Sequence, residues 1–146
     1  MERIRVAGII KIDGGYAFMH RKNVRRRKDI QDYYTFPGGG LEEGETLEEG
    51  VIREIKEEFG ITVKVIKKLY EMKSKKFDQK EYFFLCEYVE GEFGTGDGPE
   101  FSHNPKYADS GDYLPEIIKK EDIENLLLLP PEIKEKFVND LKNNNL

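Results

Sequence analysis

Residues 37–61 read PGGGLEEGETLEEGVIREIKEEFGI and join a glycine-rich turn to a strongly acidic segment. Eight glutamates fall within this stretch, which is far more charge than a turn and one helix normally need. Thr46 begins a capping-box pattern, and Gly60 is suited to the position just after a helix. The stretch therefore predicts a helix over residues 46–59 that follows a structured loop.

Three of these glutamates share one face of the predicted helix. At about 100° per residue, Glu57 and Glu58 lie within about 60° of Glu54, and apolar residues fill the neighbouring sector. Carboxylates this close repel one another. A bound divalent cation such as Mg²⁺ or Mn²⁺ would turn this repulsion into attraction to the metal, because both ions prefer oxygen ligands. Arg53 is placed to pair with Glu45 or Glu57 and to orient the acids.

Gly50 falls on the acidic face one turn before Glu54. A glycine inside a helix costs about 1 kcal/mol relative to alanine. We interpret it as leaving space for a ligand close to the backbone. For the acids taken alone, the ordinary alternative is a solvated helix surface.

The spacing of these residues resembles the Nudix box of the MutT-like hydrolases, G-x5-E-x7-R-E-U-x-E-E-x-G-U, where U is bulky and apolar. Every defined position is filled, and the matching residues are Gly39, Glu45, Arg53, Glu54, Ile55, Glu57, Glu58, Gly60 and Ile61. Average composition makes a chance match at so many positions very rare. Weaker similarity extends to DYYTFPGGG, to LCEYVEGE and to the C-terminal residues 112–137.

The resemblance implies an α/β fold, the Nudix α/β/α sandwich around a mixed β-sheet, formed by residues 1–146 as a single domain. It implies a metal-dependent pyrophosphohydrolase that cleaves a nucleoside diphosphate linked to another moiety, as in a nucleoside triphosphate or a nucleotide sugar, by attack of water on phosphorus. Mg²⁺ or Mn²⁺ is the implied cofactor. The alternatives are an RNA-end pyrophosphohydrolase and a non-catalytic nucleotide-sensing module, and retention of every box acid favours catalysis over sensing.

The resemblance also assigns roles to individual residues. It implies that the carboxylates of Glu54, Glu57 and Glu58 bind metal together with the carbonyl of Gly39. We favour Glu57 as the base or a ligand, and Glu87 is a lesser candidate from a later strand. The catalytic candidates are therefore Glu57, Glu54, Arg53 and Glu87.

Substrate contacts are expected from the loop and from the end of an earlier strand. Arg53 and Glu45 match the pair that braces the helix and the loop in the family. The basic run of residues 20–28, HRKNVRRRK, could contact phosphates or an RNA backbone, although a solvated loop is the more ordinary interpretation. The substrate-binding candidates are Arg21, Gly38, Gly39 and Glu45.

Other residues receive more ordinary interpretations. Tyr33, Tyr34 and Phe36 could stack on a base, but their alternating spacing is more typical of a core. The loop over residues 91–112 is longer than most structureless connections and suggests a substrate lid. His103 is interpreted as a surface histidine of that loop, and Glu100 is an alternative base there.

Composition limits the class of protein. The 146 residues suit one core, and the net charge of −5 argues against nucleic acid as a general partner. A small-molecule nucleotide substrate is what the resemblance implies. Cys86 is the only cysteine, which excludes an internal disulfide and fits a reducing cytoplasm. We find no secretory signal and no apolar run long enough for a membrane span. The resemblance leaves a homodimer open.

Hydrophobic patterns and turn residues predict a mixture of strands and helices. We expect strands at residues 4–13, 16–21, 33–36, 61–73, 81–91 and 112–118. Beyond the acidic helix, we expect a short helix in IENLLLL and a longer one over residues 131–143, with Pro131 near its first position.

Overall fold

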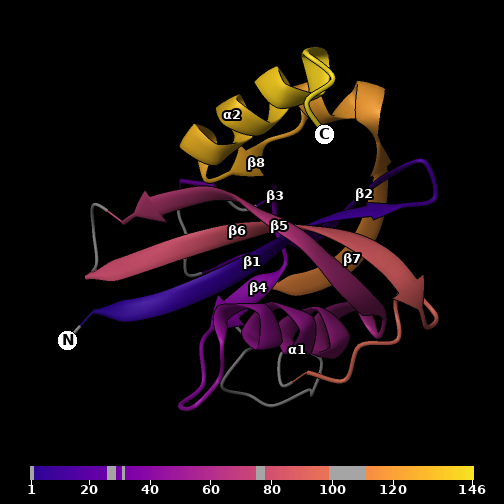
Figure 1. Cartoon of the computed structure of the whole chain (residues 1–146). Helices are drawn as coiled ribbons and strands as arrows, with labels where there is room; N and C mark the ends of the chain where they lie inside the picture. Colours follow the sequence, from indigo (N-terminus) through magenta and orange to yellow (C-terminus); the bar gives the residue numbers. More distant parts are fainter. Residues whose placement is uncertain (1, 26–28, 31, 75–77, 99–110) are drawn as a thin grey trace.

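The computed structural model of the chain describes residues 2–25, 29–30, 32–74, 78–98 and 111–146. These residues form one mixed β-sheet with helix α1 on one face and helix α2 on the other (Figure 1). The predicted α/β/α sandwich is therefore confirmed.

The strands of the sheet come from the whole length of the chain. Their bounds are β1 (Arg3–Ile12), β2 (Gly15–Lys22), β3 (Tyr33–Thr35), β4 (Gly38–Gly40), β5 (Thr62–Lys73), β6 (Gln79–Glu90), β7 (Asp112–Lys119) and β8 (Leu128–Leu129). The sheet runs in the order β5-β6-β1-β2-β3-β8, while β4 pairs with β1 and β7 pairs with β2. The pairs β1–β6 and β3–β8 are parallel, and the other pairs are antiparallel.

The sheet opens between β1 and β2. These strands pair only from Ile10 opposite Ala17 to Ile12 opposite Gly15. Nearer its start, β1 instead pairs with β4, while β2 continues beside β3 and β7. The opening therefore places the three glycines of β4 beside the first half of β1.

Helix α1 (Leu47–Phe59) has the ends that its sequence predicts. The backbone N–H of Glu49 donates to Thr46 Oγ1 at 3.1 Å, and the N–H of Thr46 donates to the Glu49 carboxylate at 2.9 Å. Gly60 ends the helix with a φ of 75°, in the left-handed region that favours glycine.

Two apolar layers cover the two faces of the sheet. Val51, Ile55 and Phe59 pack from α1 against even-numbered side chains of β1 and β6. On the other face, α2 (Pro131–Lys142) buries Ile133, Phe137 and Leu141 against odd-numbered side chains of the same strands. This alternation decides which residues of β1 and β6 face each helix.

Two local predictions differ from the structure. The loop expected at PGGG contains β4, because backbone pairing with β1 overrides the low strand propensity of glycine. IENLLLL does not form the expected short helix. Its first residues lie in the 3₁₀ helix η3 (Lys120–Asn125), and Leu128 and Leu129 pair with β3.

Other predictions agree with the structure. Strand β7 lies where DYLPEII predicts it, and Pro131 begins α2. Cys86 is buried, and burial raises the pKa of its thiol to about 12. Within the described ranges, no helix has both the length and the apolar character needed to cross a membrane.

Candidate active site

The glycines of β4 bring the backbone of the loop against β1 and against α1. A Cβ atom at Gly38 would lie 2.1 Å from the carbonyl oxygen of Val6, so only glycine allows this approach of the two strands. A Cβ atom at Gly39 would lie 2.6 Å from Glu54 Oε1. The Glu54 carboxylate therefore lies directly against the backbone of Gly39. These two positions of the Nudix box are thus in contact, although they lie on different elements.

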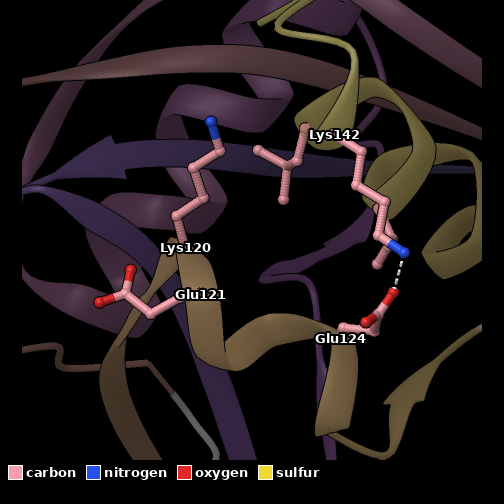
Figure 2. A pocket seen from close by; sticks show the side chains of 6 residues that line it. Lys120, Glu121, Glu124 and Lys142 are labelled. Carbon is pink, nitrogen blue, oxygen red and sulfur yellow. Dashed lines mark ion pairs between the residues drawn. The ribbon is translucent and has the colours of Figure 1, made fainter.

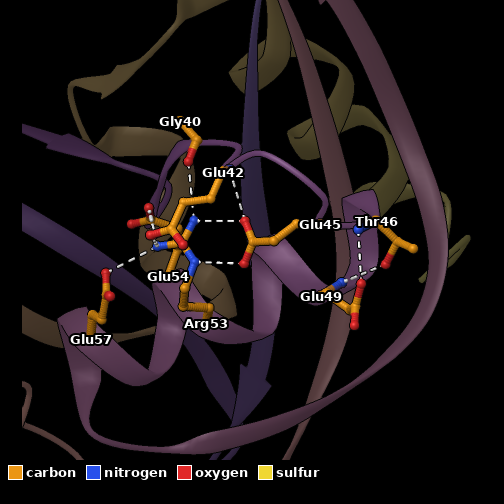
Figure 3. A network of polar contacts seen from close by, with 8 residues as sticks. All are labelled: Gly40, Glu42, Glu45, Thr46, Glu49, Arg53, Glu54 and Glu57. Carbon is orange, nitrogen blue, oxygen red and sulfur yellow. Dashed lines mark hydrogen bonds and ion pairs between the residues drawn. The ribbon is translucent and has the colours of Figure 1, made fainter.

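Arg53 connects the loop to the acids of α1 (Figure 3). Its Nε donates to Glu45 Oε2 at 2.7 Å, and its Nη2 donates to Glu45 Oε1 at 3.0 Å. Nη2 also donates to the carbonyl of Gly40 at 3.1 Å. Nη1 donates to Glu54 Oε1 at 2.9 Å and to Glu57 Oε2 at 3.2 Å. The pairing with Glu45 and Glu57 that the helical angles favour is thus present.

This network changes the protonation equilibria of its members. Hydrogen bonds from Arg53 hold the pKa of the Glu45 carboxyl below its usual value, and a backbone hydrogen bond from Glu42 adds to the effect. Hydrogen bonding to Glu45 is the largest cause that raises the pKa of Arg53. Both groups are therefore held in their charged forms at neutral pH.

The acids differ in their access to solvent. The side chains of Glu54 and Glu57 are 14% and 35% exposed, whereas Glu58 is buried at 9%. Three carboxylates on one helical turn beside a backbone carbonyl are the hard oxygen donors that Mg²⁺ and Mn²⁺ prefer. The donor set therefore fits a divalent cation.

The same side chains do not form a ready cluster of ligands. Among the residues that the structure describes, no three acidic, histidine or cysteine side chains meet closely enough to hold one ion. Arg53 contacts the carboxylates of both Glu54 and Glu57. Binding a cation here therefore requires these flexible side chains to turn away from Arg53.

Gly50 does not have the role that its position on the helix suggests. A Cβ atom there would lie 2.6 Å from Leu41 Cδ1 and 3.2 Å from Val6 Cγ2. The glycine lets α1 pack closely against Leu41 and β1, and the space is filled by these side chains. The expectation of room for a ligand is wrong, because helical angles do not reveal what packs on the face.

Glu87 lies away from the acids of α1. It is exposed on β6 and is paired in register with Lys11 of β1. Strand alternation places it on the face of Leu85, which packs in the layer of α2, while its neighbour Cys86 faces α1. Strand register therefore places Glu87 on the face of the sheet opposite α1, and its role as a base or ligand stays a prediction.

Arg21 lies at the end of β2 on the side of the sheet that faces α1. Its guanidinium carbon is 3.8 Å from the centroid of the Tyr113 ring, within the range of a cation–π contact. Its contact with substrate stays a prediction. Tyr33 and Phe36 are buried, as their alternation favours, and Tyr34 stacks on His20 with ring centroids 4.1 Å apart.

The segment that follows β6 is anchored to the end of α1. The N–H groups of Gly94 and Gly98 donate to the carbonyls of Phe59 and Glu57, both at 2.9 Å. A Cβ atom at Gly96 would lie 2.4 Å from the carbonyl oxygen of Glu57, so the chain passes very close to the acidic turn. Glu100 and His103 lie outside the described residues.

Sequence reasoning missed a polar cluster around His20. Asp32 accepts a hydrogen bond from His20 Nε2 at 2.6 Å, and Glu116 contacts the other ring nitrogen. Tyr34 donates to Glu116 at 3.4 Å. Glu116 is 96 residues from His20 in the chain, and no local pattern predicts that β7 brings it beside β2 and β3.

The C-terminal part of the fold contains a small hollow with mixed charge (Figure 2). It has a volume of about 250 Å³ and lies between η3 and α2. Lys142 and Glu124 form an ion pair at its edge, and Lys120 and Glu121 lie on another side. The opposite charges compensate one another, so the hollow does not attract ions of one sign.

Comparison with known protein families agrees with the geometry around Arg53. The model of the NUDIX domain matches residues 2–125, which include the whole sheet except β8. The chain belongs to the NUDIX family. The match ends before α2, which packs on the face of the sheet opposite the acids.

Curated relatives of this NUDIX chain have different activities. An ADP-ribose pyrophosphatase of Methanocaldococcus jannaschii is 36% identical over 98 residues, 64% of this chain and 56% of that protein. An 8-oxo-dGTP diphosphatase of Escherichia coli is 34% identical over 96 residues, 63% of this chain and 72% of that protein. An RNA pyrophosphohydrolase of Campylobacter jejuni is 36% identical over 58 residues, 40% of this chain and 36% of that protein.

Solved structures show the same NUDIX fold. The crystal structure of a NUDIX hydrolase from Nitrosomonas europaea has a TM-score of 0.70 and covers 99% of this chain and 72% of that one. Its sequence is 14% identical, so this similarity bears on the fold alone.

Proposed function

We propose that this NUDIX chain is a metal-dependent pyrophosphohydrolase that cleaves a nucleoside diphosphate linked to another moiety. The observation that carries the proposal is the contact of Arg53 with Glu45, Glu54, Glu57 and the carbonyl of Gly40. This contact joins the glycine strand to the acidic turn, which supports the proposal that a diphosphate and a cation meet there.

The metal site would use the carboxylates of Glu54, Glu57 and Glu58 and the carbonyl of Gly39. A bound Mg²⁺ or Mn²⁺ supplies neutralisation of the pyrophosphate charge and a lower pKa for the attacking water. Glu54 and Glu58 are the more buried acids, which suits residues that hold a ligand in place.

Glu57 is the acid best placed to move a proton. It is the most exposed of the three and lies at the edge of the site, where water reaches it. In its ionised form it accepts the proton of the attacking water, while the oxygen of that water bonds to phosphorus and the bond to the bridging oxygen breaks. Arg53 Nη1 holds the Glu57 carboxylate at 3.2 Å, and this contact would open when the acids turn toward a cation.

Two residues would position the reacting groups. Glu45 orients Arg53 through both of its carboxylate oxygens. Arg21 would contact substrate phosphates from the end of β2, with its guanidinium held over the Tyr113 ring.

The test is a panel of nucleoside triphosphates, nucleotide sugars and dinucleoside polyphosphates, incubated with the purified protein and Mg²⁺ or Mn²⁺. We expect cleavage of at least one phosphoanhydride, seen as new ³¹P resonances, and loss of cleavage when EDTA is added. Cleavage that continues in excess EDTA, or none with any substrate and either ion, would contradict the proposal.

An RNA end is the second candidate substrate. It is favoured by the RNA pyrophosphohydrolase among the relatives and by the basic run of residues 20–28. If RNA is the substrate, triphosphorylated RNA should be cleaved faster than free triphosphates, and the rate should fall steeply with salt. A non-catalytic sensing role is less well supported, since all the box acids are present.

A further inference from the structure

A large pocket lies on the face of the sheet away from α1. Its volume is about 580 Å³, within the range of about 300–1,000 Å³ that is usual for small-molecule sites. Flat or flexible apolar side chains form much of its wall, among them Tyr33, Phe36, Phe83 and Met72. Such walls suit a flat aromatic ligand, which stacks on rings and on thioethers.

Three charged side chains, those of Arg5, Glu81 and Glu132, interrupt this apolar wall, and the first two lie together. Arg5 of β1 and Glu81 of β6 are paired in parallel register, and both line the pocket. Glu81 is buried, with 11% of its side chain exposed, while 27% of the Arg5 side chain is exposed. A charged pair at this depth is costly to bury unless its hydrogen-bonding capacity is used.

The contact between these residues uses little of that capacity. Arg5 Nη1 lies 3.4 Å from Glu81 Oε1, at the long end of a hydrogen bond. Within the described ranges, this is the only polar side-chain contact of either residue. The pair therefore presents further guanidinium donors and a second carboxylate oxygen to a ligand in the pocket.

We infer that Arg5 and Glu81 select a guanine-type base in the substrate. This inference rests on the proposed function, since it identifies the nucleoside part of the same substrate. The Watson–Crick edge of guanine presents one acceptor, O6, followed by two donors, N1–H and N2–H. One guanidinium beside one carboxylate presents the complementary order, with the carboxylate accepting both donors as a charge-assisted pair.

Other bases match the hydrogen-bonding groups of Arg5 and Glu81 less well. Adenine presents one donor and one ring acceptor, so it engages only one carboxylate oxygen. Hypoxanthine lacks the exocyclic amine and loses one of the two bonds to Glu81. Uracil has one ring N–H between two carbonyls, and its second carbonyl faces the carboxylate, so it is the least favoured base.

The position of the pocket agrees with the position of the box. Phe36 in the pocket wall is followed directly by Pro37 and the glycines of β4. Arg5 is paired in register with Gly40, whose carbonyl accepts a hydrogen bond from Arg53. A nucleotide with its base in the pocket therefore has β4 beside its phosphates.

The first test uses the unaltered protein and ligands that it cannot cleave. Calorimetric titrations in EDTA compare GMP, IMP, AMP and UMP, which contain no phosphoanhydride bond. We expect GMP to bind at least about 10-fold more tightly than IMP and AMP, as one bidentate contact to a base supports. Equal affinities for the four nucleotides, or a preference for AMP, would overturn the inference.

The second test changes the carboxylate. Glu81→Gln replaces one acceptor with a donor, so GMP should bind at least about 10-fold more weakly while the affinity for AMP is kept. Glu90→Gln is the matched control, because Glu90 is exposed on the same strand, lies outside the lining of the pocket and should leave the preference for GMP unchanged. If Glu81→Gln binds GMP normally, or if both nucleotides weaken equally, Glu81 does not select the base.

The two proposals fail in distinguishable ways. Cleavage of nucleotides without any base preference removes the guanine inference and leaves the hydrolase proposal standing. A preference for GMP without metal-dependent cleavage of any nucleotide removes the hydrolase proposal instead. If Glu81→Gln does not fold, the comparison of GMP with IMP on the unaltered protein still decides the inference.

Discussion

The two faces of the sheet differ in the kinds of residue that they carry. On the α1 side, charged residues from a short stretch of sequence surround Arg53. On the α2 side, aromatic rings pack in a layer, and the large pocket adjoins them with one buried ion pair. The charged residues on the α1 side suit the proposed cleavage of a phosphoanhydride. The pocket on the α2 side suits the proposed selection of the base of the nucleotide. Substitutions on the two faces should therefore change different properties.

The largest expected effect lies in the α2 layer. Phe137 is fully buried, and its ring contacts Tyr16 and Phe36 at centroid distances of 5.0 and 5.8 Å. Phe137→Ala should lower the free energy of unfolding by about 3–5 kcal/mol, or the Tm by about 10–15 °C. Thermal unfolding followed by circular dichroism measures the change, with the exposed Lys136→Ala as the control. If kcat at 20 °C falls more than about threefold while the variant is still folded, the division between the faces is wrong.

The next effect lies on the α1 side and concerns rate. Glu57→Gln keeps the shape of the side chain but removes its charge, so cleavage should slow at least about 10²-fold. This corresponds to an increase of about 2.7 kcal/mol in the activation free energy. The Tm should change little. Steady-state rates with the best substrate of the panel test it, and Glu48→Gln on the exposed first turn of the same helix is the control. A near-normal rate would remove Glu57 from its proposed role.

A smaller effect is expected where the backbone contacts an acid. Gly39→Ala introduces a Cβ atom 2.6 Å from Glu54 Oε1, so this carboxylate must move. We expect kcat to fall about 10- to 30-fold, which corresponds to an increase of about 1.4–2 kcal/mol in the activation free energy. Gly40→Ala is the control, since its Cβ atom would meet only the flexible end of Arg3 at 3.3 Å. Equal rates for both variants would show that the contact between Gly39 and Glu54 does not matter for catalysis.

The α1 side could be predicted from sequence because its signals are local. Thr46 and Gly60 mark the ends of the helix, and the turn geometry alone gathers Glu54, Glu57 and Glu58. The role of Gly50 could not be predicted in the same way. Its close packing depends on Leu41 and on a strand far away in the sequence.

The α2 side depends on pairings that local patterns do not contain. Arg5 and Glu81 meet because β1 and β6 are parallel neighbours, although 75 residues separate them in the chain. The same register turns Glu87 away from α1. Leu128 likewise forms a strand, where its apolar run favours a helix, because β3 offers it a partner. Register is a property of the assembled sheet, so these features appear only in the structure.

The smallest effect tests whether the charges around Arg53 also stabilise the α1 side. Glu45 has a lowered pKa in the folded protein, so its contribution to stability is present above its ordinary pKa and is lost as the pH falls through the lowered value. Glu45→Gln keeps one acceptor oxygen for Arg53 but loses the charge, and should lower the Tm at pH 7 by about 3 °C. As the pH falls through that lowered pKa, the native carboxyl also takes up a proton, and the difference in Tm should shrink. Thermal unfolding at several pH values measures this, with the exposed Glu43→Gln as the control. A Tm difference that stays constant with pH would mean that Glu45 stabilises the loop by its shape, and that charge on this face serves catalysis alone.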